Sequence, residues 1–215
     1  MNILITGTSS GIGKAIAEKF LDEGHIVYGI DKSESAIDSK YSNYMHYKQN
    51  VLDGNYPEID NLDILINNAG IQEGDVINVN LKAVINITEH YINENIKSIV
   101  FIASSSATTG SEFPEYVASK GGVVAYMKNV ALRIAQYGAT ANSISPGGVI
   151  TPLNKHILDS EELYEKVLNE TLLNKWATAE EIAEFTYFIS VVNKSMTGED
   201  LFIDNGEKLK SNFIW

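Results

Sequence analysis

The sequence predicts an α/β fold: one domain built on a doubly wound, mostly parallel Rossmann-type sheet of about seven strands, with helices on both faces. Short apolar runs alternate with longer segments that have the periodicity of amphipathic helices. A glycine-rich turn joins the first apolar run to the first helical segment, and an acid ends the second run. No repeat, linker or low-complexity tract interrupts this pattern, so we expect residues 1–215 to form a single dinucleotide-binding domain.

The apolar runs give the positions of the strands. Residues 2–6, with Ile3, Leu4 and Ile5, are typical of a strand that is buried on both faces. A second strand of this kind is expected at 26–30, directly before Asp31. The remaining strands are expected at 44–49, 62–66, 99–103, 139–145 and 200–204.

The helical segments lie between these runs. The first ends at Gly24, and others contain Asn80, continue from Val117 or occupy 177–192. In the last of these, Thr178 is followed three residues later by Glu181, which is a capping-box pattern. The acidic, amphipathic stretch 153–169 predicts a short lid near 153–170, whereas 52–61 leaves little room for a helix.

The composition limits the classes of partner. The net charge is −12 and Arg133 is the single arginine, which argues against nucleic acids, anionic membranes and acidic proteins. No run of about 18 apolar residues predicts a membrane span, and the first residues do not resemble a signal peptide. The chain has no cysteine, which excludes disulfides and is consistent with the cytoplasm.

The glycine-rich turn, residues 6–13, predicts a pyrophosphate site. Glycines allow backbone N–H groups at a helix N-terminus to approach the phosphates, whose negative charge the helix dipole favours. Asp31 is expected to accept hydrogen bonds from the adenosine ribose and to repel a 2′-phosphate, which favours NAD over NADP. Lys32, a basic residue directly after this acid, would allow the 2′-phosphate of NADP to bind.

Tyr116 and Lys120 predict a site of proton transfer. In a helix, residues four apart lie on the same face. A free phenol titrates near pH 10, and a nearby ammonium would stabilise the phenolate and lower the pKa of the tyrosine. A hydroxyl from the preceding serine run, residues 104–106, could donate to a substrate oxygen. The spacing alone also fits an ordinary solvated helix face.

Taken together, the motifs resemble the short-chain dehydrogenase/reductase family, in the right order and across nearly the whole chain. The segments that carry the resemblance are Thr6-Gly7-x-x-x-Gly11-Ile12-Gly13, Asn67-Asn68-Ala69-Gly70, Asn80, the serine run, Tyr116-x-x-x-Lys120, Pro146-Gly147 to Thr151, and Asp204 to Gly206.

The resemblance implies an oxidoreductase that transfers a hydride between NAD(H) and a small secondary alcohol or ketone. Tyr116 would be the general acid/base, Lys120 would lower its pKa and hold the nicotinamide ribose, and Ser105 would polarise the carbonyl. Asn80 would hold a water that links Lys120 to solvent, and Thr151 would bind the carboxamide. The implied cofactor-binding residues are Gly7, Ser9, Ser10, Gly11, Ile12, Gly13, Asp31, Asn50, Val51, Asn68, Ala69, Gly70, Tyr116, Lys120, Pro146, Gly147, Val149 and Thr151.

The chain departs from the family pattern in five places. The interval from Ser105 to Tyr116 is short, which leaves Ser104 and Ser106 open as the active serine. Asn50 replaces an aspartate beside the adenine, and Asn205 replaces a glycine. The segments 52–61 and 70–80 are shorter than the family usually has, which we interpret as a trimmed scaffold that keeps its catalytic groups.

The remaining features predict packing and assembly. The four histidines have no metal-ligand spacing, so no metal site is expected. Trp176 is expected to pack the lid onto the domain, and the apolar tail Phe213-Ile214-Trp215 suggests a homodimer or homotetramer.

Two alternatives to this interpretation stay open, and a third is disfavoured. One is an NAD-binding sensor or scaffold without catalysis. Another, within the enzymes, is a reductase similar to 3-oxoacyl-[acyl-carrier-protein] reductases. A methyltransferase is disfavoured because it has no need for the tyrosine–lysine pair.

Overall fold

The computed structural model describes residues 1–210 and contains one seven-stranded sheet. Every pair of neighbouring strands is parallel, and the order is β3-β2-β1-β4-β5-β6-β9. The strands are β1 (Asn2–Thr6), β2 (Ile26–Asp31), β3 (Tyr44–Lys48), β4 (Ile64–Asn67), β5 (Ser98–Ile102), β6 (Thr140–Pro146) and β9 (Asp200–Ile203). The predicted Rossmann-type sheet of seven strands is confirmed.

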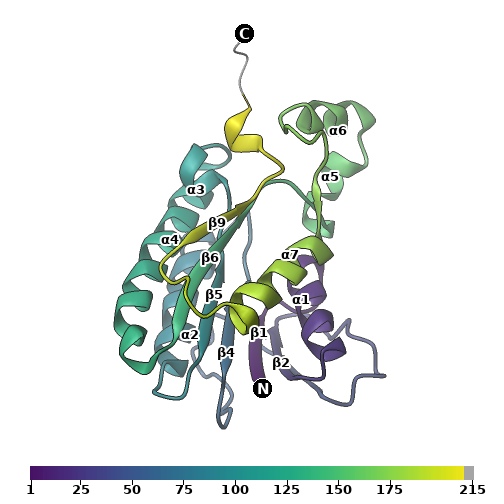
Figure 1. Cartoon of the computed structure of the whole chain (residues 1–215). Helices are drawn as coiled ribbons and strands as arrows, with labels where there is room; N and C mark the ends of the chain where they lie inside the picture. Colours follow the sequence, from purple (N-terminus) through teal and green to yellow (C-terminus); the bar gives the residue numbers. More distant parts are fainter. Residues whose placement is uncertain (211–215) are drawn as a thin grey trace.

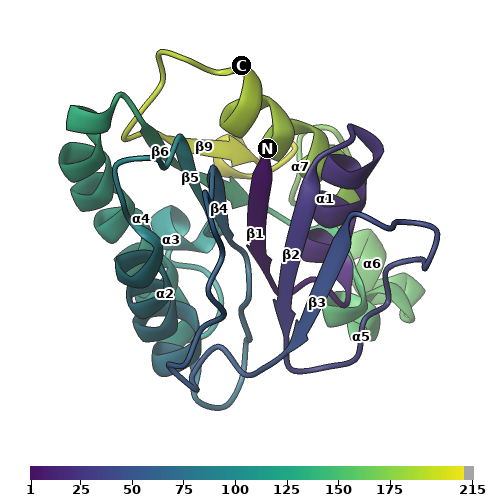
Figure 2. The ribbon, with the colours of Figure 1, turned by 90° about the horizontal axis from the view of Figure 1, so that it is seen from below.

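Helices cover both faces of the sheet (Figures 1 and 2). On one face, α1 (Gly11–Asp22) and α7 (Ala179–Tyr187) pack against each other and against Ile3, Ile5 and other residues of the same strand faces. On the other face, α2 (Ala83–Tyr91) and α4 (Pro114–Ile134) pack over Leu4, Leu65 and Phe101. Successive side chains along each strand therefore belong to two separate apolar clusters on opposite faces, as expected of a sheet that is buried on both sides.

The strand order reverses between β1 and β4, and this point determines where a ligand can bind. The chain runs outward from β1 to β3 and then returns to add β4 on the other side of β1. Thr6 joins the two strand ends, because its hydroxyl accepts hydrogen bonds from the amides of Asn68 and Ala69, each at 3.0 Å. In open α/β sheets the crevice beyond such a reversal is the usual ligand site.

The predicted lid is helical but divided. Instead of one helix, the chain forms α5 (Lys155–Leu158) and α6 (Glu161–Leu168), which extend away from the sheet in Figure 1. Ser160 separates them, since its hydroxyl accepts a hydrogen bond from the Leu163 amide and so starts a new helix. Trp176 is 8% exposed and makes an edge-to-face contact with Tyr164 of α6, as the sequence predicted.

The other helices follow the sequence with local changes. The capping box of α7 is present, and its last turn continues as a π-helical turn, Phe188–Val192. Asn80 lies in another π-helical turn, Asn78–Lys82, directly before α2. The short helix α3 (Ser106–Thr109) and the two-residue strands β7 (Val149–Ile150) and β8 (Ala177–Thr178) were not predicted, because such short elements leave no periodic pattern.

Two further expectations concern the apolar tail and membrane-spanning helices. The apolar tail 213–215, on which the prediction of an oligomer depended, lies outside the described residues. Along residues 1–210, none of the helices has the length and apolar character needed to cross a membrane.

Candidate active site

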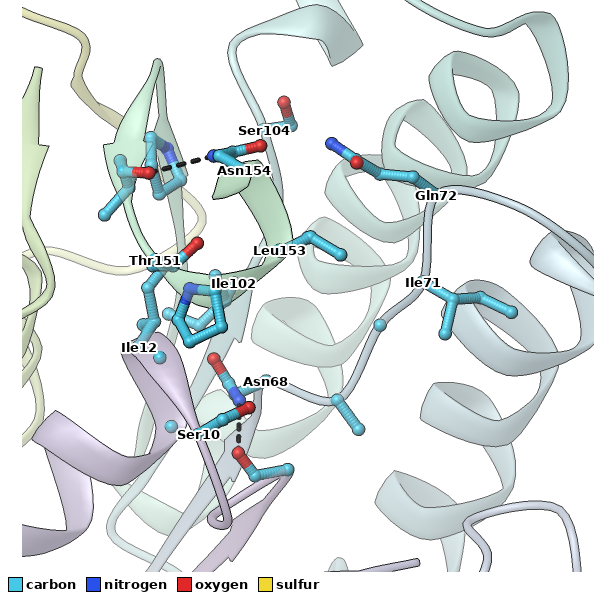
Figure 3. Close-up of a pocket in the computed structure, with 18 of the residues that line it drawn as sticks. Ser10, Ile12, Asn68, Ile71, Gln72, Ile102, Ser104, Thr151, Leu153 and Asn154 are labelled. Atoms are coloured by element: carbon cyan, nitrogen blue, oxygen red, sulfur yellow. Dashed lines mark hydrogen bonds between the residues drawn. The ribbon is translucent and has the colours of Figure 1, made fainter. Parts of the chain in front are cut away.

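A cavity of about 840 Å³ lies at the carboxyl ends of the central strands. Figure 3 shows Leu153 with Asn154, and Ile71 with Gln72, on either side of it. Of the predicted site residues, only Asn80 does not line this cavity. Those that do are Gly7, Ser9, Ser10, Gly11, Ile12, Gly13, Asp31, Asn50, Val51, Asn68, Ala69, Gly70, Ser105, Tyr116, Lys120, Pro146, Gly147, Val149 and Thr151.

The glycine-rich turn packs so closely that it has no room for a side chain at Gly7 or Gly13. A Cβ on Gly13 would overlap the Gly7 carbonyl oxygen. Gly7 itself has φ 78°, and a Cβ on it would lie 2.8 Å from Asn68 Nδ2. Asn68 Nδ2 in turn donates to the Thr6 carbonyl at 2.9 Å, which fixes the turn against the end of β4. The turn is therefore held in place from the neighbouring strand.

The turn also has unused hydrogen-bonding groups that fit a phosphate. Ser10 precedes α1 but makes no side-chain capping bond, which leaves the first amides of the helix without that partner. The Ser9 hydroxyl is buried and, among the described residues, has no hydrogen-bond partner. An anion with several acceptor oxygens would satisfy both groups, so these residues fit the pyrophosphate of a dinucleotide.

Asp31 lies at the end of β2, where the sequence predicted the ribose-binding acid. Its carboxylate accepts hydrogen bonds from the Ser9 amide at 3.0 Å and from the Ser33 amide at 2.9 Å. Lys32 and Ser33 also line the cavity. Asn50 lines it too, and its amide oxygen accepts a hydrogen bond from the Leu52 amide at 3.1 Å.

Tyr116 and Lys120 lie on the same face of α4, with the Lys120 ammonium 5.7 Å from the centre of the Tyr116 ring. The ammonium donates a hydrogen bond to the Ile102 carbonyl at 2.9 Å, and the lysine is only 5% exposed. Burial lowers the pKa of Lys120 to about 8, against the opposing effect of Glu112.

The pKa of Tyr116 differs from the sequence-based expectation. Burial, followed by the negative charge of Glu112, raises it to about 12, and the Ser104 hydroxyl opposes this rise. The lowering that was expected from Lys120 does not appear in the protein alone. The physical reason is that the ammonium is directed at the Ile102 carbonyl, while the phenol is largely removed from water.

The serine run divides among three environments because β5 ends at Ile102 and α3 begins at Ser106. Ser104 lines the cavity, and its hydroxyl lowers the pKa of Tyr116. Ser105, the residue selected from the sequence, also lines the cavity, and its hydroxyl lowers the pKa of Glu207. Ser106 is 1% exposed and donates to the Ser104 hydroxyl at 2.9 Å. These effects on pKa associate Ser104 with Tyr116 and Ser105 with Glu207, while both serines line the cavity.

Asn80 is buried behind the cavity wall and contacts the tyrosine–lysine helix. Its amide oxygen accepts from the Ile71 amide and its nitrogen donates to the Ile71 carbonyl, both at 2.8 Å. The same nitrogen lies 3.2 Å from Ser119 Oγ. A Cβ on Gly70 would lie 3.4 Å from Asn80 Oδ1 and 3.5 Å from Lys120 Nζ, so the two side chains flank Gly70.

Thr151 links the glycine-rich turn to the lid. A Cβ on Gly11 would lie 3.4 Å from the Thr151 side chain. Three residues later, Asn154 donates to the Val149 carbonyl at 2.9 Å, a bond drawn in Figure 3. The start of the lid is thereby tied to the strand end that was expected to meet the nicotinamide.

The sequence did not single out two carboxylates of the cavity, Glu112 and Glu207. Burial raises the pKa of both, and the charge of Glu207 raises that of Glu112 further. Glu112 has φ 83°, a conformation that non-glycine residues seldom adopt. No motif could have revealed the pair, because the two residues are far apart in the sequence. Over residues 1–210, no three His, Asp or Glu side chains come together to hold a metal ion.

Comparison with known proteins gives consistent relatives. A family model described as enoyl-(acyl carrier protein) reductase matches residues 7–208. The 3-oxoacyl-[acyl-carrier-protein] reductase FabG of Buchnera aphidicola subsp. Acyrthosiphon pisum is 31% identical over 234 aligned positions, which cover 94% of this chain and 95% of that protein.

Solved structures agree over the same length. The structure of a 4-hydroxyisoleucine dehydrogenase mutant with NADH and succinate has a TM-score of 0.88 at 27% identity, covering 99% of this chain and 100% of that one. A candidate 2-deoxy-d-gluconate 3-dehydrogenase from Agrobacterium tumefaciens with bound NADP has a TM-score of 0.90 at 25% identity, with coverages of 97% and 96%.

Proposed function

Since this chain belongs to the short-chain dehydrogenase/reductase family, oxidoreductases that act on alcohols or ketones with NAD(P), we propose that it interconverts a small secondary alcohol and its ketone with NAD. The observation that carries the proposal is the placement of Tyr116, Ser104 and Lys120 in one cavity with the glycine-rich turn and Asp31. The bound nicotinamide supplies or accepts the hydride, and the chain orients the substrate and manages the proton.

The preference for NAD rests on Asp31. A carboxylate at the end of β2 offers acceptors to the two ribose hydroxyls and repels a 2′-phosphate. Solved relatives are described with NADH in one case and NADP in another, so family membership alone leaves the choice open. Comparing the binding of NADH and NADPH by calorimetry tests this part of the proposal.

The proton role falls to Tyr116. With its pKa raised to about 12, the phenol is protonated at neutral pH and can donate to the oxygen of a ketone that is being reduced. The Ser104 hydroxyl, which lines the same cavity and lowers the pKa of this phenol, can donate to that oxygen as well. Lys120, with a pKa of about 8, still carries a charge at pH 7 and would hold the nicotinamide ribose, while Asn80 beside it would hold a water.

The substrate side of the cavity carries negative charge. Glu112 and Glu207 both line it. Burial and then the charge of Glu207 raise the pKa of Glu112, and burial and then the charges of Asp204 and Glu170 raise the pKa of Glu207. This arrangement disfavours a substrate carboxylate or phosphate close to the reacting carbon. Neutral or hydroxyl-bearing ketones therefore fit this part of the site best.

A 3-oxoacyl-[acyl-carrier-protein] reductase is the second candidate, and the name of the Buchnera relative favours it. The overall charge of −12 argues against it, because carrier proteins are acidic and would be repelled rather than attracted. A third reading, a cofactor-binding sensor without catalysis, would require that the tyrosine and lysine serve no reaction.

One assay separates these candidates. The assay measures the rate of NADH oxidation as the loss of nicotinamide absorbance. We expect this rate to be higher with small neutral ketones than with a carrier-bound 3-oxoacyl thioester. Faster turnover of the thioester would favour the second candidate. NADH binding without turnover of any carbonyl compound would favour the sensor.

The variant Tyr116→Phe tests the assigned proton donor. It removes one hydroxyl from the cavity, so we expect kcat to fall by about 10²–10⁴-fold or more. The dissociation constant of NADH, measured by calorimetry, should stay within a few-fold of the original value, since Phe keeps the ring. Undiminished turnover in this variant would refute the mechanism.

A further inference from the structure

Hydrogen bonds connect the Asp31 carboxylate to the neighbouring strand β3. As described above, Asp31 accepts from the Ser9 amide and from the Ser33 amide. The carbonyl of Ser33 lies 2.9 Å from His46 Nε2, and His46 belongs to β3. The loop after β2 is thus attached to β3 through one imidazole nitrogen.

The second imidazole nitrogen leads back to the glycine-rich turn. His46 Nδ1 lies 2.9 Å from the Tyr44 hydroxyl, and that hydroxyl lies 2.8 Å from Thr8 Oγ1. Thr8 directly precedes Ser9, whose amide holds Asp31. The contacts therefore form a closed ring, which runs from Asp31 to the turn, through Tyr44 and His46, and back through Ser33.

One assignment of hydrogens satisfies the whole ring. The Ser33 carbonyl can only accept, so His46 Nε2 must carry the hydrogen, and in a neutral imidazole Nδ1 is then the acceptor. Tyr44 consequently donates to Nδ1, and Thr8 donates to the Tyr44 oxygen. Burial raises the pKa of Tyr44, and the Thr8 hydroxyl opposes this rise.

The packing around the ring depends on a glycine. Gly29 of β2 is paired with His46 of β3 in the sheet register. A Cβ on Gly29 would overlap both the Tyr44 hydroxyl and Thr8 Oγ1. Tyr44 and His46 are two residues apart on the strand, so they project from the same face toward this gap. The sheet has no side chain at the one point where the ring passes across β2.

We propose that Tyr44 and His46 are positioning residues that fix the Asp31 carboxylate and the Ser33 loop for the adenosine ribose. They thereby set both the affinity for NAD and its discrimination from NADP. The inference rests on the proposed function, because it assumes that Asp31 binds the ribose. When either link is removed, the carboxylate and the loop with Lys32 gain freedom. NAD then binds more weakly, because its ribose no longer finds a preformed acceptor. The 2′-phosphate of NADP is repelled less, because the carboxylate can move away from it.

The test compares Tyr44→Phe and His46→Ala with the unmodified protein, using calorimetric titrations with NADH and NADPH. We expect the dissociation constant of NADH to rise about five- to tenfold, the scale of one net hydrogen bond. The constant for NADPH should rise less, so that discrimination falls. His46→Gln, whose amide nitrogen can donate to the Ser33 carbonyl, should recover part of the loss. In turnover, KM for NADH should rise while kcat at saturating cofactor changes less than twofold.

A matched control and a second readout separate positioning from general damage. Met45→Leu alters the residue between the two, which is 39% exposed and projects from the opposite face of β3, and it should leave both constants unchanged. In the cofactor-free protein, hydrogen exchange at the Ser9 and Ser33 amides should accelerate in Tyr44→Phe and His46→Ala. Unchanged exchange at these amides, or an unchanged NADH constant in both variants, would overturn the inference. If the unmodified protein binds neither cofactor, the proposed function fails, and the exchange measurement still decides on the positioning.

Discussion

The Tyr116 hydroxyl and the Lys120 ammonium share a buried environment that moves their pKa values in opposite directions. Burial favours the neutral form of each group, and so raises the pKa of the phenol to about 12 and lowers that of the ammonium to about 8. At neutral pH the phenol keeps its proton. In the proposed function this protonated phenol is the donor for ketone reduction, which consumes a proton.

Glu112 offers a way to test this electrostatic balance. Its negative charge raises the pKa of both Tyr116 and Lys120, so removing the charge should lower both values. For Glu112→Gln we expect the pH profile of kcat/KM for alcohol oxidation, which requires the phenolate, to move toward lower pH. Glu115→Gln, in the exposed first turn of α4, is the control and should leave the profile in place. A profile that stays put or moves toward higher pH in Glu112→Gln would contradict the assignment.

The choice between serines gives a second test at the level of single residues. Because the Ser104 hydroxyl acts on the pKa of Tyr116, we expect Ser104→Ala to reduce kcat by about 10²-fold, the typical effect of losing one donor to a developing oxyanion. Ser105→Ala should change kcat by only a few-fold, since that hydroxyl acts on the pKa of Glu207. Steady-state kinetics of ketone reduction measures both. A larger loss in Ser105→Ala would restore the choice that the sequence favoured.

The serines also show what a sequence can and cannot specify about a site. The tyrosine–lysine spacing predicted that both residues would lie on one helix face, and they do, because helical geometry is local. Which serine reaches the tyrosine depends on how the chain leaves β5 and enters α3, a four-residue helix with no pattern of its own. The pKa of Tyr116 could not be predicted from the sequence, because it depends on burial and on the charge of Glu112, which are set by the tertiary structure.

Among the secondary-structure elements, α1 depends most on a close approach of backbone. Gly13→Ala would force its Cβ into the Gly7 carbonyl, so we expect a loss of about 1–3 kcal/mol in unfolding free energy and weaker NADH binding. The control is Gly121→Ala within α4, where the nearest atom to a Cβ lies 3.9 Å away. There alanine should stabilise the protein by about 0.5–1 kcal/mol, because it favours helix.

Denaturant titration of both glycine variants gives the unfolding free energies, and calorimetry gives the NADH constants. Equal stability in Gly13→Ala and Gly121→Ala would show that the turn can relax around a methyl group. That result would remove the close approach as the reason for glycine at position 13.

The elements differ in how well the sequence predicted them. The seven strands were located to within about two residues, because continuous apolar runs mark strands buried on both faces. The capping box of α7 was also found, since it depends on two residues three apart. The lid was expected as one helix, and the break at Ser160 was missed because the amphipathic pattern continues across it.

At the scale of the whole molecule, the order of motifs predicted more than any single motif did. Each motif on its own fits several structures. The order of the motifs along the chain predicts which strand ends meet at the reversal between β1 and β4. The two carboxylates that line the cavity could not be predicted from the order of the motifs. Glu112 and Glu207 meet only because the end of the chain returns over the cavity beyond β9.

The cavity is lined by residues from Gly7 to Glu207, and so by nearly the full length of the chain. A ligand that occupies it holds the first turn and the last described helical turn in one unit, and unfolding must release it. At a free concentration 100 times its dissociation constant, such a ligand adds about 2.7 kcal/mol to the stability. The resistance of this protein to proteolysis should therefore rise with the concentration of the nicotinamide dinucleotide that it binds.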